Sequence, residues 1–217
     1  MKADFWHDRW ESGRTGFHQD EANRYLVQFW DRLGVAVSAK VFVPLCGKSK
    51  DMLWLRDHGH TIIGAELSPI ATRDFFDENG LKAESSKQGE FEQWEGEGVR
   101  ILCGDVFKLA AIDLDGVGAV YDRAGLIALP PEVRRDYVNH LRDILPLGIK
   151  LLLVTIAYPQ DQKGGPPFSV QDDEVQELFR EGFEVAQVAS ENVLAESRRF
   201  AGFVDYLNEN AYLLTRV

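Results

Sequence analysis

The sequence has few cysteines, a deficit of positive charge and no long apolar run. Its 217 residues include two cysteines, Cys46 and Cys103, and each stands alone, which argues against a disulfide framework or a paired-cysteine zinc site. The net charge is −11, whereas non-specific binding to nucleic acid or to an anionic membrane relies on a basic patch. The apolar run LLLVTIAY at 151–158 is far too short to span a bilayer, and the charged start MKADFWHDRWESGR is unlike a signal peptide. We therefore expect a cytoplasmic protein, by default a monomer, with no metal, nucleic-acid or membrane partner.

Apolar runs that alternate with helical patterns make up most of the chain. Strands are predicted at 40–44, 61–67, 99–105, 118–123, 149–158, 183–191 and 210–217, and helices at 20–34, 48–58, 69–78, 131–145 and 172–181. The first five strands are nearly continuous apolar runs, which is typical of parallel strands covered on both faces. The alternation predicts a doubly wound α/β sheet in a single domain spanning 1–217. The last two strands lack a helix between them, so we expect an antiparallel hairpin at a sheet edge.

Two helix boundaries can be predicted from local residue types. Asp20 is a candidate N-cap for the first of these helices, and Gly34 is a candidate for its end. Ser68 and Pro69 form a typical start for the helix at 69–78, and Gly80 a typical stop.

The stretch VFVPLCGKSKDM (41–52) resembles the end of a phosphate-binding loop. Such a loop needs an additional glycine five residues before the Gly-Lys pair, and Phe42 occupies that position. The dinucleotide fingerprint G-x-G-x-x-G is missing as well. What remains is a strand, a tight turn ending at Gly47, a helix and a second strand that ends at Glu66, 19 residues further on. This spacing suits a carboxylate that binds ribose hydroxyls, although Glu66 could also be a plain helix-flanking carboxylate.

Six segments occur in an order that is typical of one enzyme family. They are FWHDRWESGRTGFHQ, VPLCGKSKDMLWL, GAELS, YDRAGLIALPPEVR, GPPFSV and AYLLTRV. Over essentially its whole length the chain resembles the bacterial type of thiopurine S-methyltransferases, a branch of the class I S-adenosylmethionine-dependent methyltransferases. The resemblance implies a Rossmann-like methyltransferase fold with a seven-stranded sheet in the order 3-2-1-4-5-7-6, strand 7 antiparallel. It also implies S-adenosylmethionine as cofactor, thiopurines and related aromatic or heteroaromatic thiols as acceptors, and selenium or tellurium compounds as further candidates.

The resemblance also assigns cofactor contacts. Residues 1–20 would form an N-terminal lid, and the contacting positions would be Trp10, Leu45, Glu66, Asp105, Val106 and Arg123. Glu66 would take the ribose hydroxyls, Asp105 and Val106 would lie by the adenine, and Arg123 by the methionine end of the cofactor. Two alternatives stay open. Trp6 and Trp10 are spaced i, i+4 and could form a core stripe of a short helix, and Asp105 could cap the turn that it begins.

The acceptor side is assigned in the same way to Phe17, Phe168 and Arg198. Arg123 and Arg198 would position an anionic thiolate. A thiol of low pKa is already largely ionised near neutral pH, so no general base is required. Arg199 follows Arg198 directly, which leaves open which of the two faces the pocket; a solvated basic turn is the preferred interpretation for Arg199. Phe17 could instead anchor the lid, and Phe168 could belong to an ordinary Pro-rich connection.

The residues also leave two functions from other classes open. One is a non-catalytic domain that binds or senses an adenosine compound, and the other is a dinucleotide-dependent oxidoreductase, against which the missing glycines argue. Cys46 and Cys103 are interpreted as small buried hydrophobic residues and not as nucleophiles.

Overall fold

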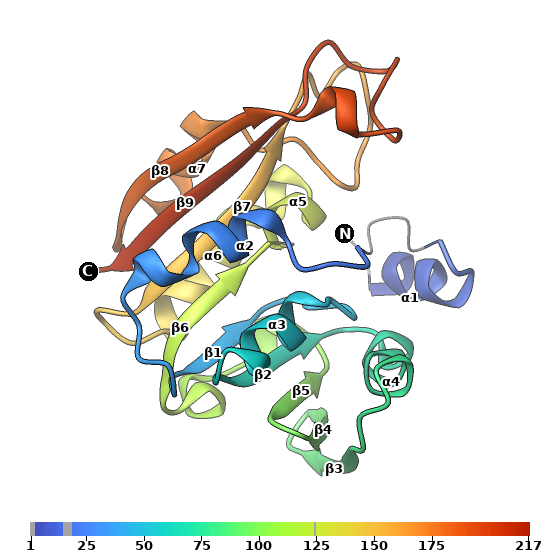
Figure 1. Ribbon diagram of the computed structural model, residues 1–217, viewed down its shortest axis with the longest axis vertical. Coiled ribbons are helices and arrows are strands. Elements are labelled where there is room, and N and C mark those ends of the chain that lie inside the picture. The colour runs from blue at the N-terminus through green and yellow to red at the C-terminus, as the bar shows by residue number, and fades with distance from the viewer. Residues whose placement is uncertain (1–2, 15–18, 124) are drawn as a thin grey trace. The chain divides into compact units, whose positions relative to one another are not determined.

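The computed structural model describes residues 3–14, 19–123 and 125–217 (Figure 1). The chain divides into two compact units, Met1–Tyr121 and Asp122–Val217, which are described in turn.

The first unit is built on a mixed sheet. Its strands are β1 (Lys40–Val43), β2 (Thr61–Glu66), β3 (Glu84–Gln88), β4 (Phe91–Gly96), β5 (Val99–Cys103) and β6 (Val117–Asp122), in the order β3-β4-β5-β2-β1-β6. The strand β1 runs parallel to β2 and β6, and β2 runs parallel to β5. The strands β3 and β4 form an antiparallel hairpin that joins β5. The carboxyl ends of β1, β2 and β5 therefore meet at one edge of this sheet.

The helices of the first unit are α1 (Ala3–Glu11), α2 (Arg24–Phe29), α3 (Asp51–Asp57), α4 (Pro69–Glu78) and the 3-10 turns η1 (Trp30–Leu33), η2 (Val106–Lys108) and η3 (Ala111–Leu114). The helices α3 and α4 contact β2, and α4 also contacts β5. Ser68 caps α4 as predicted, because its Oγ accepts a hydrogen bond from the N–H of Ala71 at 3.4 Å. Gly34 ends η1 in the left-handed conformation, with φ at 65°. The N-cap prediction for Asp20 is wrong: Asn23 caps α2 and accepts from the N–H of Tyr25 at 2.9 Å.

A buried carboxylate fastens the start of α3. Asp51 is 1% exposed, and its Oδ1 accepts a hydrogen bond from the N–H of Asn23 at 2.7 Å. Its Oδ2 accepts from the hydroxyl of Tyr121, at the end of β6, at 3.0 Å. One aspartate thus joins the segment before α2, the start of α3 and strand β6, which fixes the turn that precedes α3.

The second unit contains β7 (Lys150–Ala157), β8 (Phe183–Asn192) and β9 (Asn208–Arg216), in the order β7-β9-β8 with both pairs antiparallel. Its helices are α5 (Gly125–Ala128), α6 (Pro131–Ile144), α7 (Asp172–Phe179) and the 3-10 turn η4 (Leu194–Glu196). The helix α5 contacts β7, and α7 contacts α6 and β8. Figure 1 shows β8 and β9 side by side, as the predicted terminal hairpin requires.

The predicted sheet is confirmed in class and corrected in number. The described residues form nine strands, and the expectation of seven is therefore wrong in number. Within each unit, the seven expected strands lie in the predicted order, 3-2-1-4 in the first and 5-7-6 in the second. The two additional strands are β3 and β4. The residues of β3, ESSKQ, are almost all exposed, so this strand lacks the apolar pattern by which the others were found.

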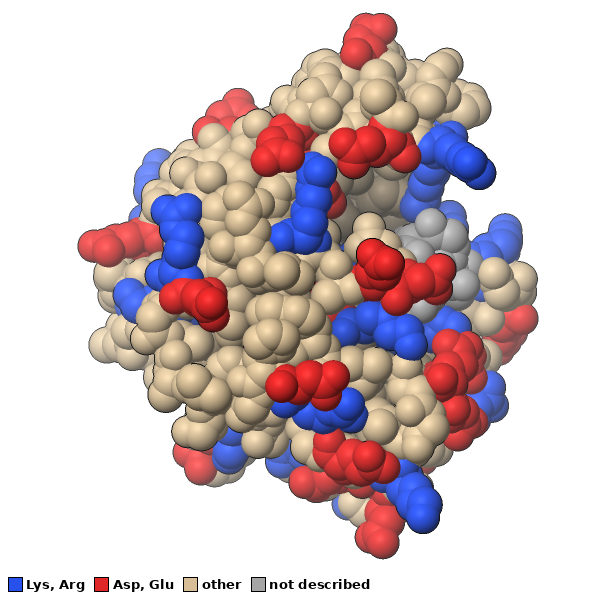
Figure 2. All heavy atoms as spheres, viewed as in Figure 1, with Lys and Arg blue, Asp and Glu red and all other residues tan. Residues whose placement is uncertain are grey.

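The surface carries charges of both signs. Figure 2 shows acidic and basic side chains interspersed over the viewed face. Among the residues described, no helix combines the length and the apolar character needed to cross a bilayer.

Candidate functional site

A strained turn follows β1 at the sheet edge where β1, β2 and β5 end. Leu45 has φ at 45° and Gly47 has φ at 53°, so two backbone positions of the turn are left-handed. A non-glycine residue such as Leu45 adopts this conformation at a cost of about 1–2 kcal/mol. The N–H of Cys46 donates to the carbonyl oxygen of Ala65 in β2 at 3.0 Å, which holds the turn against the neighbouring strand. Strain of this kind is concentrated at functional sites.

Glu66 links this turn to the start of α4. It is the last residue of β2 and is 7% exposed. Its Oε2 accepts a hydrogen bond from the N–H of Gly47 at 2.8 Å, and its Oε1 accepts from the N–H of Ser68 at 2.7 Å. Burial raises the pKa of Glu66, and the backbone N–H groups oppose that rise. An ionised carboxylate offers about four acceptor sites, so a ligand with two hydroxyls can still bind to it. In addition to flanking α4, Glu66 thus bonds the turn after β1.

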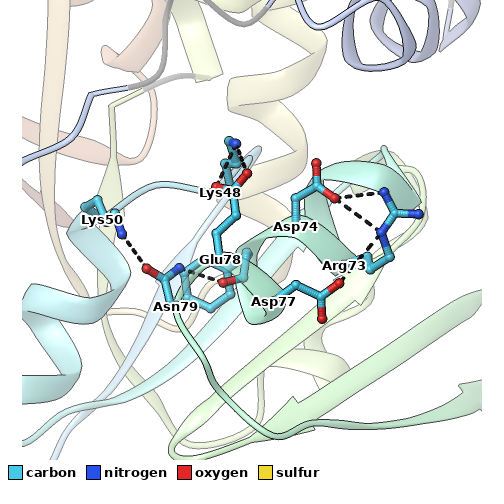
Figure 3. Close-up of polar contacts among 8 residues, drawn as sticks. Lys48, Lys50, Arg73, Asp74, Asp77, Glu78 and Asn79 are labelled. Carbon is cyan, nitrogen blue, oxygen red and sulfur yellow. Dashed lines mark hydrogen bonds and ion pairs between the residues drawn. The ribbon is translucent and has the colours of Figure 1, made fainter.

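The lysine after Gly47 does not form part of a phosphate loop. The ammonium group of Lys48 lies 2.5 and 2.7 Å from the two carboxylate oxygens of Glu78 at the end of α4 (Figure 3). Lys50 donates in the same way to the side-chain oxygen of Asn79. The N–H of Gly47 donates to the Glu66 carboxylate, whereas in a phosphate loop it would point at the phosphates. This arrangement agrees with the rejection of the phosphate-loop interpretation on sequence grounds.

Trp10 lies on the turn. Its indole is buried, and its Cζ2 would be 3.4 Å from a Cβ at Gly47, an ordinary packing distance, so the ring packs directly against the turn. Trp6 is half-buried one helical turn earlier and meets the ring of Phe5 edge-on at a centroid distance of 5.4 Å. A short helix, which this spacing allows, is present as α1 and contacts α4. Phe17, the other aromatic residue assigned near the lid, lies outside the described residues.

Asp105 and Val106 follow β5 at the same edge. The Oδ1 of Asp105 accepts a hydrogen bond from the N–H of Phe107 at 3.0 Å, so Asp105 does cap the turn η2. The N–H of Gly104 donates to the backbone carbonyl of Glu66 at 2.8 Å, which sets this turn beside β2. Val106 is buried and Asp105 is exposed. The cap engages one oxygen of Asp105 and is compatible with a second role for its carboxylate.

Both cysteines are buried in the first unit. Burial is the main cause that raises the pKa of the Cys46 thiol, and the charge of Glu66 adds to it. Burial also raises the pKa of the Cys103 thiol, against a hydrogen bond with Thr72. A protonated thiol is a poor nucleophile, so neither cysteine competes with an external thiol. The structure thus supports their interpretation as small hydrophobic residues.

The second unit begins with a buried carboxylate that sequence reasoning missed. Asp122 is fully buried; its Oδ1 accepts from the N–H of Gly125 at 2.8 Å and its Oδ2 from the hydroxyl of Tyr137 at 2.7 Å. Burial and the charge of Asp122 raise the pKa of Tyr137. These bonds fix the backbone on either side of Arg123, which is half-buried. The sequence signal that could have indicated Asp122 is its position next to Arg123 at the end of a strand, in YDR (121–123).

A second missed residue, Arg134, organises the surroundings of Phe168. Its fully buried guanidinium donates to two carbonyl oxygens in and just after α5, at 3.0 Å each. It also donates to the carbonyl of Ser169 at 3.1 Å and to a carboxylate oxygen of Glu174 at 2.5 Å. The N–H of Phe168 donates to the carbonyl of Ile127 at 2.7 Å, and the Phe168 ring lies 6.0 Å from the Arg134 guanidinium carbon. Phe168 is therefore held in a defined place against α5.

The neighbouring arginines Arg198 and Arg199 differ in burial and in their contacts. Arg198 is exposed, whereas Arg199 is half-buried and its Nη2 donates to the carbonyl oxygen of Pro166 at 2.8 Å. The preference for Arg199 as a solvated turn residue is therefore wrong, because this side chain binds the loop that carries Phe168. Sequence alone could not distinguish two neighbouring arginines.

Comparison with known proteins places the chain in a family. The family model described as Thiopurine S-methyltransferase matches residues 1–217. The chain is 46% identical to the thiopurine S-methyltransferase of Nitrosospira multiformis, covering 99% of this chain and 98% of that one. It is 49% identical to the thiopurine S-methyltransferase of Pseudomonas entomophila, with both chains fully covered.

A solved structure confirms the fold at low sequence identity. The SAM-dependent methyltransferase of Anabaena variabilis matches with a TM-score of 0.68 at 14% identity, over 99% of this chain and 95% of that one. These findings, together with the carboxylate and turn at the ends of β1 and β2, identify an S-adenosylmethionine-dependent methyltransferase. The chain belongs to the thiopurine S-methyltransferase family.

Proposed function

We propose that this enzyme transfers a methyl group to the sulfur of aromatic and heteroaromatic thiols, thiopurines included, and that selenium and tellurium compounds can replace sulfur. The activity named for its relatives, thiopurine S-methylation, supports the acceptor class. The observation that carries the proposal is Glu66, a buried carboxylate held by two backbone N–H groups at the end of β2.

The cofactor site is proposed along the edge of the first unit. Glu66 would accept hydrogen bonds from the ribose hydroxyls, since the N–H groups of Gly47 and Ser68 already fix its orientation. Leu45 would contact the cofactor from the strained turn, and Trp10 would offer its aromatic face to the cationic sulfonium. Asp105 and Val106 would lie by the adenine. When bound, S-adenosylmethionine supplies an activated methyl carbon.

The acceptor site is proposed in the second unit. A thiol of low pKa is largely thiolate near neutral pH and needs no general base. Arg123 and Arg198 would orient this anion as fixed cations, and Arg123 would also contact the cofactor. Phe168 would contact the aromatic ring of the acceptor. The family resemblance adds Phe17, which lies outside the described residues, as a further acceptor contact. The protein's contribution to rate is then alignment and electrostatics.

A thiol panel with methyl-labelled cofactor tests this proposal. We expect label transfer to aromatic thiols but not to the matching phenols, and at least a tenfold loss of turnover in Arg123→Ala, as about 1.5–3 kcal/mol for a lost charged hydrogen bond implies. The control is Arg135→Ala, an exposed arginine on α6. Binding of S-adenosylhomocysteine without transfer to any thiol would favour the sensor function. Binding of NAD instead would favour an oxidoreductase.

Further expectations about the whole chain stay proposals. We propose a single methyltransferase domain over 1–217 with residues 1–20 as a lid, and a monomer in the cytoplasm. Light scattering during gel filtration measures the molar mass in solution, and a monomer should give about the chain mass of 24.5 kDa.

A further inference from the structure

Two loops of the second unit share an apolar core. The first loop comprises residues 158–169 and the second comprises residues 193–207; together they are called the paired loops below. Tyr158 and Phe200 lie in this core with ring centroids 5.0 Å apart, and Val204 and Leu207 are buried beside them. The first loop carries Phe168 and the second carries Arg198, two of the residues proposed to bind the acceptor.

Polar bonds join the paired loops at two further places. The guanidinium of Arg199 donates to the carbonyl oxygen of Pro166 at 2.8 Å. Gln162 and Asp205 exchange two bonds: the Nε2 of Gln162 donates to the Asp205 carboxylate at 2.5 Å, and the N–H of Asp205 donates to the Oε1 of Gln162 at 2.9 Å. The ammonium of Lys163 also lies 5.4 Å from the ring centroid of Phe200. The links are spread over both loops and are not confined to one residue.

The first loop is also closed on itself. The Nε2 of Gln160 donates to the carbonyl of Lys163 at 2.6 Å and to the hydroxyl of Tyr158 at 3.1 Å. Its Oε1 accepts from the N–H of Ser169 at 2.8 Å, and the Tyr158 hydroxyl donates to the carbonyl of Pro167 at 2.7 Å. These bonds join the two ends of the loop, Tyr158 and Ser169, through Gln160. A bond that restrains any part of this loop is therefore expected to restrain Phe168 as well, because Phe168 lies next to Ser169.

We propose that Arg199 and the Gln162–Asp205 pair are positioning residues for the acceptor. They hold the paired loops together, so that Phe168 and Arg198 present one surface to the thiol. Arg199 acts through the Pro166 carbonyl and not as a cation on the substrate. This inference rests on the proposed acceptor site and assigns to it residues that do not touch the acceptor.

Two variants separate positioning from charge. Arg199→Met removes both a bond and a cation, whereas Gln162→Ala removes bonds and leaves the charge unchanged. We expect both to raise the KM for an aromatic thiol by about tenfold, because each loses a charge-assisted bond, and to leave the Kd for S-adenosylhomocysteine within twofold. The matched control is Arg180→Met, an exposed arginine that directly follows α7 and pairs with Glu177; its KM should not change.

The result that overturns the proposal is equally specific. If Arg199→Met raises the KM and Gln162→Ala does not, Arg199 acts as a charge and the positioning role is wrong. Equal losses of cofactor and acceptor affinity would indicate general damage to the fold and would likewise overturn it.

Amide hydrogen exchange tests the coupling without any activity. Each variant should speed exchange in both paired loops and not in β7 or α6, since the loops lose a shared restraint. Unchanged exchange in both variants would overturn the proposal. If the wild-type protein methylates no thiol, the proposed function fails, and hydrogen exchange still decides whether the loops are coupled.

Discussion

Replacement of Glu66 by glutamine is the sharpest perturbation of the cofactor site. The two side chains have the same shape, but glutamine presents one oxygen and one NH2 group where the carboxylate presents two oxygens. Each oxygen of Glu66 accepts a backbone N–H, from Gly47 at 2.8 Å and from Ser68 at 2.7 Å. One of these N–H groups must face the NH2 of glutamine, and under the proposed ribose contact one hydroxyl would lose its acceptor. The variant therefore disturbs both the turn and the ligand contact.

The expected magnitude follows from the bond that is lost. A hydrogen bond to a charged group contributes about 1.5–3 kcal/mol, which corresponds to a factor of about 10–100 in Kd. Thermal stability should change little, because the removed charge is one whose burial is unfavourable, as the raised pKa of Glu66 shows. Removal of this buried charge stabilises the fold and offsets the cost of the unsatisfied N–H group, which is about 1–3 kcal/mol. We expect affinity to fall sharply while the melting temperature stays within a few degrees.

Calorimetric titration with S-adenosylhomocysteine measures this effect. The control variant is Glu95→Gln, which removes an exposed carboxylate from β4 in the same unit. If Glu66→Gln binds S-adenosylhomocysteine within twofold of the wild type, Glu66 does not bind the ribose and the assignment is refuted.

The pH dependence of the same site has a defined sign. Burial raises the pKa of Glu66 above its ordinary value of 4.5, so the folded protein takes up this proton more readily than the unfolded chain. The contribution of Glu66 to stability is therefore fully present below that ordinary value and is lost as pH rises through the raised pKa. Cofactor affinity should change in the opposite direction, falling as pH drops through the raised pKa. Titrations across this range should show the fall in the wild type and a flat profile in Glu66→Gln.

Two glycines give further predictions. Gly47→Ala should destabilise the protein by about 1–2 kcal/mol, because φ at this position is 53°. It should also weaken S-adenosylhomocysteine binding, because relief of the strained φ would shift the Gly47 N–H that holds Glu66; unchanged melting and binding would contradict the described turn. Gly125→Ala would place a Cβ 2.5 Å from the Tyr137 hydroxyl and 2.7 Å from Asp122. We expect a loss of about 1–3 kcal/mol in denaturant unfolding, whereas Gly148→Ala, where no atom lies within 4 Å of the new Cβ, should show only the cost of its own positive φ.

The strands that were predicted correctly share a strong apolar signal. The strand β7 has eight residues, most of them buried. A continuous apolar run of this length is typical of a strand covered on both faces, so it could be predicted from sequence. The hairpin of β3 and β4 has no such signal, because its exposed residues form strands through pairing with β5 and not through burial. The N-cap of α2 was misplaced for a similar reason. Asn23 is selected by its tertiary bond to Asp51, which the local sequence around Asp20 does not contain.

The candidate site also contains residues that could be predicted from sequence and residues that depend on tertiary contacts. The turn after β1 and the carboxylate at the end of β2 could be found from their spacing, because parallel strands bring their carboxyl ends to one edge. Asp122 and Arg134 were missed, since a buried charge is visible only when its partners are known. The difference between Arg198 and Arg199 depends on one carbonyl 33 residues away in the chain.

The sequence by itself determined the family, the cofactor, the α/β class and the order of seven strands within the two units. Apolar periodicity, which is a local property of the chain, predicted the α/β class, and the resemblance of six segments to one enzyme family implied the cofactor and the strand order. Only the tertiary structure decided how Glu66 is held, which arginine binds the Pro166 carbonyl and where buried charges find their partners. These features depend on hydrogen bonds between residues far apart in sequence, and backbone groups that meet only after folding supply most of the bonds.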